Sequence, residues 1–278
     1  MLRRSELVPL VAALGLAASG CGASDPVAAE EVSAAVARTA SERSSRIEIR
    51  GEDGDEKVVM RGVADHERRR ASFTYDATSS EGKPITGAKL LAIGSTIYVE
   101  TSILGLAESP PAEPEQKPWS KIEGIDEAPT LNTLLFPFPF IEPGRLLAAF
   151  ERVSGKVEAL GKETVRGVET DHYRLTLELE RLIETAPARD RAGLRKELEA
   201  RKSKTQPVEI WIDDAGLARR VRVVVESDPV TIDFFDFGVE VDVEAPPDDQ
   251  VEDFDAFFGV DDTEVGSGEI EPEPKEDE

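Results

Sequence analysis

The sequence has little of the side-chain chemistry on which enzymes depend. Its 278 residues include one cysteine, Cys21, and two histidines, His66 and His172. The single cysteine has no partner for an intramolecular disulfide. The G-x-S-x-G, P-loop, G-x-G-x-x-G, H-E-x-x-H and C-x-x-C motifs are also missing. We therefore expect no catalytic residue, no metal site and no cofactor, and an enzyme would need convergent ionisable groups in a cleft.

The two histidines occur in similar contexts, "RGVADH" before position 66 and "RGVETDH" before position 172. This similarity hints at a faint internal repeat. Equivalent positions of a repeat lie apart more naturally than they converge on one site. The sequence therefore predicts that His66 and His172 are solvated strand residues.

The chain also lacks an apolar run long enough to span a bilayer, which takes about 20 residues. The run over residues 7–18 has 12 residues, follows Arg3 and Arg4, and ends in small residues before Cys21. These features are typical of a secretory signal. They also resemble the bacterial lipoprotein signal, in which diacylglycerol is attached to the cysteine thiol and cleavage makes the cysteine the new N-terminus. The alternative is an ordinary secretory signal with a chance cysteine.

The resemblance to a lipoprotein signal implies that residues 1–20 are removed and that residues 21–25 form a lipidated cysteine and a short tether. Two acyl chains would attach Cys21 stably to the membrane. The residues between the lipid and Asp25 can extend over only ~10 Å. We therefore expect the protein at the extracytoplasmic face of the cell membrane, with its body close to the bilayer.

Positive charge is scarce, and the negative charge is unevenly spread. The formal net charge is −24, and residues 242–278 hold 16 acidic residues and one basic residue. We expect residues 252–278 to form a disordered acidic tail, either solubilising or binding a cation or a partner. This charge argues against nucleic acid and against docking on anionic headgroups. The basic "ERRRAS" at residues 67–72 could bind a headgroup phosphate or form a solvated turn that pairs with local acids.

From Arg46 onward, apolar and polar residues alternate with a period of two, as in the strands of an antiparallel meander. The predicted strands are "RIEIR", "KVVMRGVADH", "RASFTYDA", "KLLAIGS", "STIYVET", "VEALGKETV", "TDHYRLTLELE", "PVEIWIDDAG", "LARRVRVVVES" and "TIDFFDFGVEVDVEAP". In the seventh, residues 173, 175, 177 and 179 face one way, and residues 172, 174, 176 and 178 face the other. The sequence predicts a large sheet with one apolar and one solvated face.

The apolar face of such a sheet must be covered. Helices are predicted over residues 26–42, 143–155 and 189–202, and Asp25-Pro26 supplies an N-cap followed by a proline at the first helical position. The last of these helices is mostly polar and covers little. The fold class is thus α+β, with a large antiparallel sheet and helices packed on its apolar face.

A proline-rich region over residues 102–142 separates the two halves of the predicted sheet and contains "LNTLLFPFPFIEPG". Pro137 and Pro139 exclude a regular helix or a central strand there. An apolar segment of this kind is unfavourable when it is exposed to solvent. We expect it to pack as a lid or plug on the apolar face, or to line a ligand site.

The order of "KPWSKIE", "VEALGKETVRGVETDHYRLTLELE", "PVEIWIDDAGLARRVRVVV" and "DFGVEVDVEAPPDDQV" behind Cys21 resembles actinobacterial lipoproteins of the LppX/LprG type, within the LolA-like lipoprotein-carrier fold. The resemblance covers residues 26–251. It implies that the large antiparallel sheet is strongly curved into an incomplete β-barrel with helices packed on its concave face, where a hydrophobic cavity lies. Members of the family bind acylated lipids or glycolipids there and are implicated in moving them outward from the cytoplasmic membrane.

No residue-level binding motif carries over from that family, because generic apolar side chains line the cavity. Each apolar residue of the inner face could be ordinary core or cavity wall. The candidates for the cavity or its mouth are Leu134, Leu135, Phe136, Phe138, Phe140, Ile141, Leu147, Phe150, Tyr173, Leu175, Leu177, Ile210 and Ile212.

The sequence thus favours a lipid-binding or lipid-transfer lipoprotein anchored through Cys21. Its expected partners are the membrane, an acyl lipid or glycolipid, and an envelope transporter or acceptor protein, with no nucleic acid. The alternative is a non-enzymatic envelope sensor or adaptor with the same fold, which would use its surface.

Overall fold

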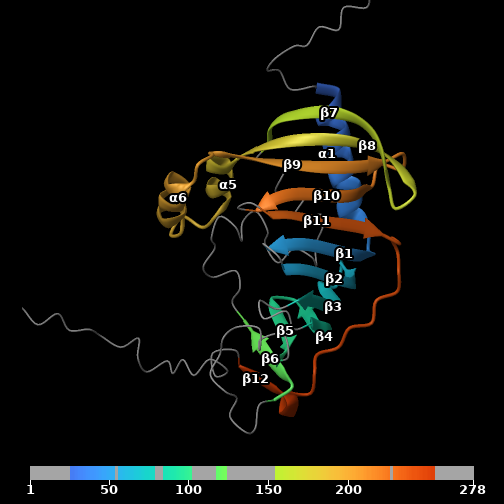
Figure 1. The fold of residues 1–278 in the computed structure, drawn as a ribbon, viewed down its shortest axis with the longest axis vertical. Coiled ribbons are helices and arrows are strands. Elements are labelled where there is room, and N and C mark those ends of the chain that lie inside the picture. The colour runs from blue at the N-terminus through green and yellow to red at the C-terminus, as the bar shows by residue number, and fades with distance from the viewer. Residues whose placement is uncertain are drawn as a thin grey trace, which may run out of the picture.

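The computed structural model describes residues 26–53, 56–78, 84–101, 117–123, 154–225 and 228–253 (Figure 1). Within these ranges there are three α-helices and one short 3₁₀ helix, and the rest of the regular structure is a single sheet. The helices are α1 (Pro26–Ser41), α5 (Leu179–Thr185), α6 (Arg191–Ala200) and the 3₁₀ helix η2 (Asp248–Gln250).

The sheet has 12 strands in the order β12-β6-β5-β4-β3-β2-β1-β11-β10-β9-β8-β7. All neighbours pair antiparallel except β12 and β6, which are parallel. The two end strands do not pair, so the barrel is incomplete, and the predicted fold class is confirmed. The strands are β1 (Ser44–Asp53), β2 (Glu56–Asp65), β3 (Arg70–Thr78), β4 (Pro84–Ile93), β5 (Thr96–Glu100), β6 (Trp119–Ile122), β7 (Ser154–Val165), β8 (Val168–Glu178), β9 (Thr205–Asp213), β10 (Ala218–Val225), β11 (Asp228–Phe235) and β12 (Val251–Asp253).

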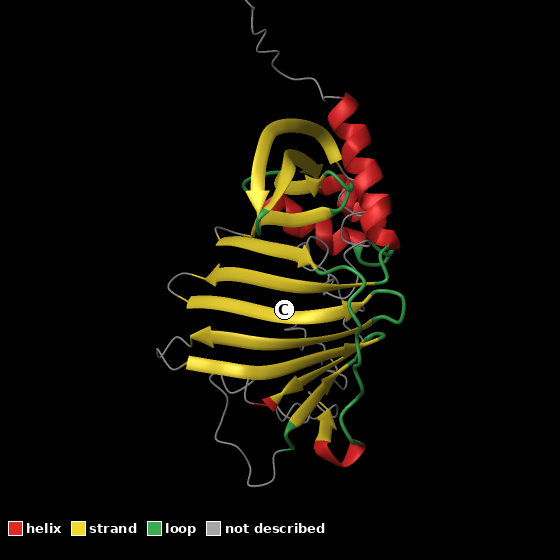
Figure 2. Cartoon of the chain, turned by 90° about the vertical axis from the view of Figure 1, so that its right-hand side faces the viewer, coloured by secondary structure: helices red, strands yellow, loops and turns green. Residues whose placement is uncertain are grey.

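The strand registers carry one apolar face continuously across the sheet. Ile47 of β1 lies opposite Phe234 of β11 and Gly62 of β2. Gly62 in turn lies opposite Phe73 of β3. These side chains belong to one buried hydrophobic cluster that continues through β9 and β8. We name this the inner face, and α1 packs on it against β7 and β10 (Figures 1 and 2).

Helix α1 forms where Asp25-Pro26 predicted it. Its buried residues, Ala28, Val32, Ala35, Val36 and Thr39, are spaced three or four apart and so form one stripe. The hydroxyl of Thr39 accepts a hydrogen bond of 2.9 Å from the backbone N–H of Ala218, at the start of β10. The stripe and this bond hold the helix on the inner face, as predicted.

The region after β8 differs from the prediction. The alternation of Tyr173, Leu175 and Leu177 was expected to continue to Leu179, but β8 ends at Glu178 and Leu179 begins α5. Leu179, Leu182 and Ile183 are the buried residues of α5, and their spacing is helical. Helix α5 packs against α6, which occupies ten residues of the predicted helix over residues 189–202. These two helices lie beside the sheet at the end of β8 (Figure 1).

Two other predicted boundaries also shift. The strand expected to run through "TIDFFDFGVEVDVEAP" ends at Phe235, and residues 236–247 form no strand. Glu252 and Asp253, predicted as the start of the tail, lie in β12, where they pair with β6. Ser154 and Gly155, predicted as the end of a helix, begin β7. The rest of that predicted helix and residues 254–278 lie outside the described residues.

The hairpin of β7 and β8 curls onto the opposite, outer face of the sheet. Its turn residue Arg166 lies 4.0 Å from the centre of the Phe235 ring on β11. The Arg166 guanidinium is 3.3 Å from Glu48 of β1 and 3.6 Å from Asp233 of β11. The tip therefore reaches across three intervening strands and covers part of the face that the sequence predicted to be solvated.

Candidate functional site

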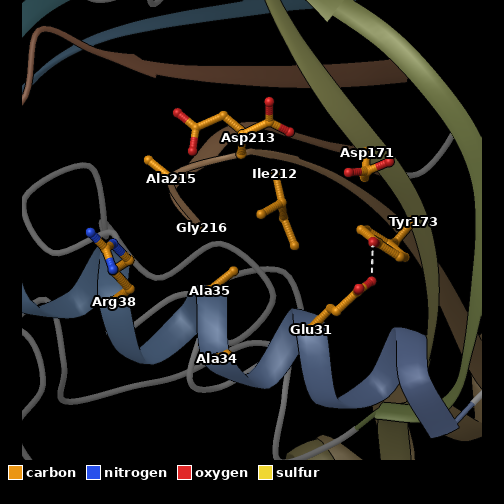
Figure 3. Close-up of a pocket in the computed structure, with 11 residues that line it drawn as sticks. Glu31, Ala34, Ala35, Arg38, Asp171, Tyr173, Ile212, Asp213, Ala215 and Gly216 are labelled. Atoms are coloured by element: carbon orange, nitrogen blue, oxygen red, sulfur yellow. Dashed lines mark hydrogen bonds between the residues drawn. The ribbon is translucent and has the colours of Figure 1, made fainter.

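A pocket of about 520 Å³ opens between α1 and the strands β8 and β9 (Figure 3). Helix α1 supplies Glu31, Ala34, Ala35 and Arg38 to its wall. The strands and the turn after β9 supply the opposite wall: Asp171, Tyr173, Ile212, Asp213, Asp214, Ala215 and Gly216. The volume lies in the range of small-molecule sites in proteins. The small side chains of α1 and of the turn leave this space open.

Tyr173 connects the two walls of the pocket. Its side chain is on the inner face of β8, only 5% of the residue is exposed, and its hydroxyl donates a hydrogen bond to the Glu31 carboxylate on α1 (Figure 3). The ring belongs to the hydrophobic core, while its oxygen lies at the pocket. Tyrosine suits such a boundary because it combines an apolar ring with one polar end.

Most of the polar side chains around the pocket are already engaged. The buried carboxylate of Asp213 accepts the backbone N–H of Leu217 at 2.9 Å and the Nε–H of Arg219 at 2.5 Å. These bonds and the left-handed backbone of Gly216 shape the β9–β10 turn that closes one end of the pocket. The segment "DDAG" forms this turn, and its glycine has a positive φ of 73°.

Lys162 of β7 lies close to the carboxylates of Glu169, Asp171 and Asp214, and the last two of these residues line the pocket. Its Nζ lies 2.9 Å from Glu169, 3.8 Å from Asp171 and 4.0 Å from Asp214. The hydrogen bond to Glu169, together with the charges of Asp171, Glu169 and Asp214, holds the pKa of Lys162 above its usual value. The pocket therefore combines an apolar floor, made by Ala35 and Ile212, with a polar rim in which charges of both signs are present.

Two of the predicted cavity residues, Tyr173 and Ile212, line this pocket. Leu175, Leu177 and Ile210 lie on the same inner face and are packed in the core. Their role as cavity wall stays a prediction. The other candidates lie outside the described residues, as does the anchor Cys21: Leu134, Leu135, Phe136, Phe138, Phe140, Ile141, Leu147 and Phe150.

The helix side of the pocket was not predicted from the sequence. Ala34 and Arg38 lie off the apolar stripe of α1 and looked like ordinary solvated positions. They line a pocket because α1 packs beside β8, and no local pattern shows that contact. Small residues at positions 34, 35, 215 and 216, on two segments far apart in the sequence, were the available signal.

The outer face carries a network of charges around Asp233, whose side chain is fully buried. Arg220 bonds it through Nε at 2.6 Å and Nη2 at 2.9 Å, and Arg50 bonds it at 2.9 Å. Burial alone would raise the pKa of Asp233, but the hydrogen bonds and charges of Arg220 and Arg50 outweigh it and lower the pKa. The network joins β1, β10 and β11 on the face opposite the pocket.

The structure also places the two histidines and the basic cluster at residues 67–72. His172, predicted as solvated, is buried against Trp211, so that prediction is wrong. His66 lies in the turn after β2, with Nε2 3.0 Å from the Ser45 hydroxyl. The arginines of "ERRRAS" lie at the β2–β3 turn, where Arg68 pairs with Asp65 at 3.9 Å and Arg70 donates to the Val243 carbonyl at 2.8 Å.

Two features are absent from the described residues: a group of side chains that could hold a metal ion, and a helix that could cross a membrane. No group of three or more His, Cys, Asp or Glu side chains in this part of the chain could hold a metal ion. No helix in the same part is long and apolar enough to cross a membrane.

No protein-family model matches the chain. A curated relative, an uncharacterized 31.2 kDa protein of the rplA-rplJ intergenic region of Streptomyces griseus, is 32% identical over 108 residues. The match covers 36% of this chain and 35% of the relative, so it spans about a third of that protein.

Among solved structures, the chain is similar to the lipoprotein LppX of Mycobacterium tuberculosis, with 17% identity over 80% of this chain and 100% of LppX and a TM-score of 0.49. It is also similar to LprF of Mycobacterium bovis, with 13% identity over 81% of this chain and 99% of LprF and a TM-score of 0.49. No ligand follows from either likeness.

Proposed function

We propose that the chain is a membrane-anchored extracytoplasmic lipoprotein that binds an acyl lipid or glycolipid and takes part in lipid transfer or envelope assembly. The observation that carries the proposal is the open sheet whose apolar inner face meets a pocket with a polar rim. An amphiphile needs that combination: apolar side chains along its acyl chains and polar groups beside its headgroup. No catalytic residue is required.

The inner face favours acyl chains on energetic grounds. Each methylene group that leaves water contributes about 0.8 kcal/mol, so a dozen contribute on the order of 10 kcal/mol before the costs of binding. The inner face is apolar from β5 to β8, and Ile212 and Ala35 continue it into the pocket floor. In this proposal the chains of the ligand lie along that face, and its headgroup lies at the pocket rim.

The remaining parts of the proposal rest on the sequence. Cys21 would hold the protein in the outer leaflet of the cytoplasmic membrane, and the short tether would hold the body near its donor bilayer. The apolar residues 134–141, with Leu147 and Phe150, would form the cavity mouth. A transporter or acceptor protein of the envelope would receive the ligand.

Filling the pocket tests where the ligand binds. Ala34 is exposed on α1 and lines the pocket, whereas Ala37 is exposed on the same helix and does not line it. We expect Ala34→Trp to weaken the uptake of a fluorescent diacyl lipid at least about tenfold. Ala37→Trp is the matched control and should bind like the unaltered protein.

The outcomes separate two functions. Equal lipid uptake by both tryptophan variants would show that the lipid does not bind in the pocket. No uptake by the unaltered protein, with phospholipids or glycolipids offered, would contradict lipid binding and favour the envelope sensor or adaptor.

A further inference from the structure

A second constellation lies on the outer face, away from the pocket. His172 of β8 and Trp211 of β9 are opposite each other in register and stack with ring centres 4.1 Å apart and planes 10° apart. Only 8% of His172 is exposed and only 4% of Trp211. Outer-face residues of a one-sided sheet are normally solvated. The burial of this pair therefore needs a partner from elsewhere, and the β7–β8 hairpin provides it.

Glu163, near the tip of the hairpin, contacts both rings. Its Oε2 accepts the Trp211 indole N–H at 2.8 Å, and its Oε1 lies 3.4 Å from Nδ1 of His172. On the other side of the imidazole, Oε2 of Glu209 lies 3.8 Å from Nε2. The imidazole therefore lies between carboxylates of β7 and β9. Nε2 is buried and makes no hydrogen bond.

Two arginines lie around Glu209 and lower its pKa. Arg174 of β8 bonds Glu209 at 2.7 Å, and Arg222 of β10 lies 3.5 Å from it. Burial would raise the pKa of Glu209, but the hydrogen bond from Arg174 and the charges of His172, Arg174 and Arg222 lower it. Arg220 of β10 lies with its guanidinium 5.8 Å from the centre of the Trp211 ring and interacts electrostatically with Glu163.

The two protonation states of the imidazole differ in how well this site suits them. A neutral imidazole donates through only one nitrogen, so it can satisfy one carboxylate and leaves the other nitrogen as an acceptor facing a negative charge. A protonated imidazole donates through both nitrogens and is attracted by both carboxylates. Histidine changes between these states near physiological pH.

We propose that His172 is a proton-operated clamp: protonation draws Glu163 and Glu209 together across β8 and tightens the β7–β8 hairpin on the outer face. The hairpin also contacts the outer face through Arg166, which forms ion pairs with Glu48 and Asp233. The clamp also borders the pocket, because the next residue, Tyr173, carries the hydroxyl that binds Glu31 of α1. This role does not depend on which ligand the inner face takes.

In this proposal the attraction of Glu163 and Glu209 for the protonated imidazole exceeds the repulsion from Arg174, Arg220 and Arg222 and the cost of burying the charge. The protonated form gains attraction from both carboxylates only when the chain is folded. The hairpin should therefore be tighter and the protein more stable at pH 5.5, and this gain should be lost as the pH rises toward 8. Carboxyl groups in model peptides have pKa values near 4, below this range.

The chain suits a direct test, because it has two tryptophans and two histidines. A protonated imidazole in contact with an indole quenches its fluorescence more strongly than a neutral one. In a Trp119→Phe background, Trp211 emission should rise between pH 5 and pH 8. The rise should disappear in His172→Gln and persist in His66→Gln. In Glu163→Gln and Glu209→Gln it should move to lower pH.

Stability provides the second readout. The unfolding equilibrium constant of the unaltered protein should be about three to ten times larger at pH 7.5 than at pH 5.5, and His172→Gln should lose most of that difference. Should His172→Gln fail to fold, the NMR signals of the two imidazoles and the hydrogen exchange of the hairpin amides can be followed in the unaltered protein. Emission that stays flat with pH, a rise that persists in His172→Gln, or hairpin amides whose protection factors, corrected for the intrinsic exchange rate at each pH, are the same at both pH values would each overturn the clamp.

Discussion

The hydroxyl of Tyr173 on β8 donates a hydrogen bond to the carboxylate of Glu31 on α1 and so joins the sheet to its covering helix across the pocket. These residues are 142 positions apart in the sequence. Both residues of this bond line the pocket. The bond makes the seam between α1 and β8 the part of the proposed site that is easiest to test.

Tyr173→Phe should therefore loosen the seam without disturbing the core, because the ring stays in place. We expect a loss of about 1 kcal/mol in the free energy of unfolding, measured with urea, since Glu31 is exposed and part of the bond is replaced by water. Glu31→Gln should cost less, and the double variant should cost no more than Tyr173→Phe alone. Additive losses would show that the two residues act independently.

Gly62 is expected to be irreplaceable for a steric reason. A Cβ at this position would lie 2.1 Å from the backbone oxygen of Ser72 and 2.6 Å from Cδ1 of Phe73. Because Phe73 is fully buried on the inner face, its ring cannot move into solvent. Gly62→Ala should lower the free energy of unfolding by about 2–3 kcal/mol.

Gly193 is the matched control for that substitution. It lies in α6, and a Cβ there would meet nothing within 4 Å. Gly193→Ala should be neutral or stabilising by up to about 1 kcal/mol, because alanine favours the helix. Similar losses in the two variants would argue against the contact between Gly62 and Phe73.

The Asp233 network predicts a loss of stability in acid. The pKa of Asp233 is lowered in the folded chain because the bonds and charges of Arg220 and Arg50 outweigh its burial. A carboxyl with a lowered pKa adds stability above its unfolded pKa of about 3.9, and the protein loses that stability as the pH falls through the folded value. The free energy of unfolding should therefore drop between pH 5 and pH 3.

Asp233→Asn should remove part of this pH dependence and cost about 2–4 kcal/mol at pH 7, because it leaves the partly exposed guanidinium groups of Arg220 and Arg50 without their buried charge partner. Asp236→Asn removes an exposed partner of Arg46 and serves as the control. It should change little. If the free energy of unfolding of Asp233→Asn fell as steeply between pH 5 and pH 3 as that of the unaltered protein, Asp233 would not be the source of the acid instability.

Cys21→Ser tests the proposed anchor. If the thiol carries the acyl chains, the variant should move from the membrane fraction to the soluble extracytoplasmic fraction. The mass of the unaltered mature chain should exceed that of its polypeptide from residue 21 by a diacylglycerol group. An unmodified thiol in the exported protein would mean an ordinary secretory signal.

Local patterns were sufficient to predict much of the sheet. The alternation of Tyr173, Leu175 and Leu177 identified the inner face of β8, and Asp25-Pro26 identified the start of α1. The same alternation gave the wrong result at Leu179, since a strand pattern and the helical spacing of Leu179, Leu182 and Ile183 overlap there. The sequence contained both signals, and packing against α6 favours the helix.

The outer face could not be predicted in the same way. His172 and Trp211 alternate with apolar residues as solvated side chains do, and they are buried only because the tip of the β7–β8 hairpin curls over them. The contacts of Glu163 and Arg166 with β9, β11 and β1 are tertiary. The pocket has the same origin, because its walls come from a helix and strands that are distant in the sequence. Two of its lining residues, Tyr173 and Ile212, were candidates because they lie on the apolar face, and their role in holding a ligand stays a prediction.

Native mass spectrometry of the domain without residues 1–21, purified from a lipid-containing host, tests the central claim most directly. The account predicts a stoichiometric adduct that organic extraction releases as an acyl lipid, and whose occupancy falls in Ala34→Trp but not in Ala37→Trp. A clean apo mass, with no uptake of offered phospholipid or glycolipid, would contradict it.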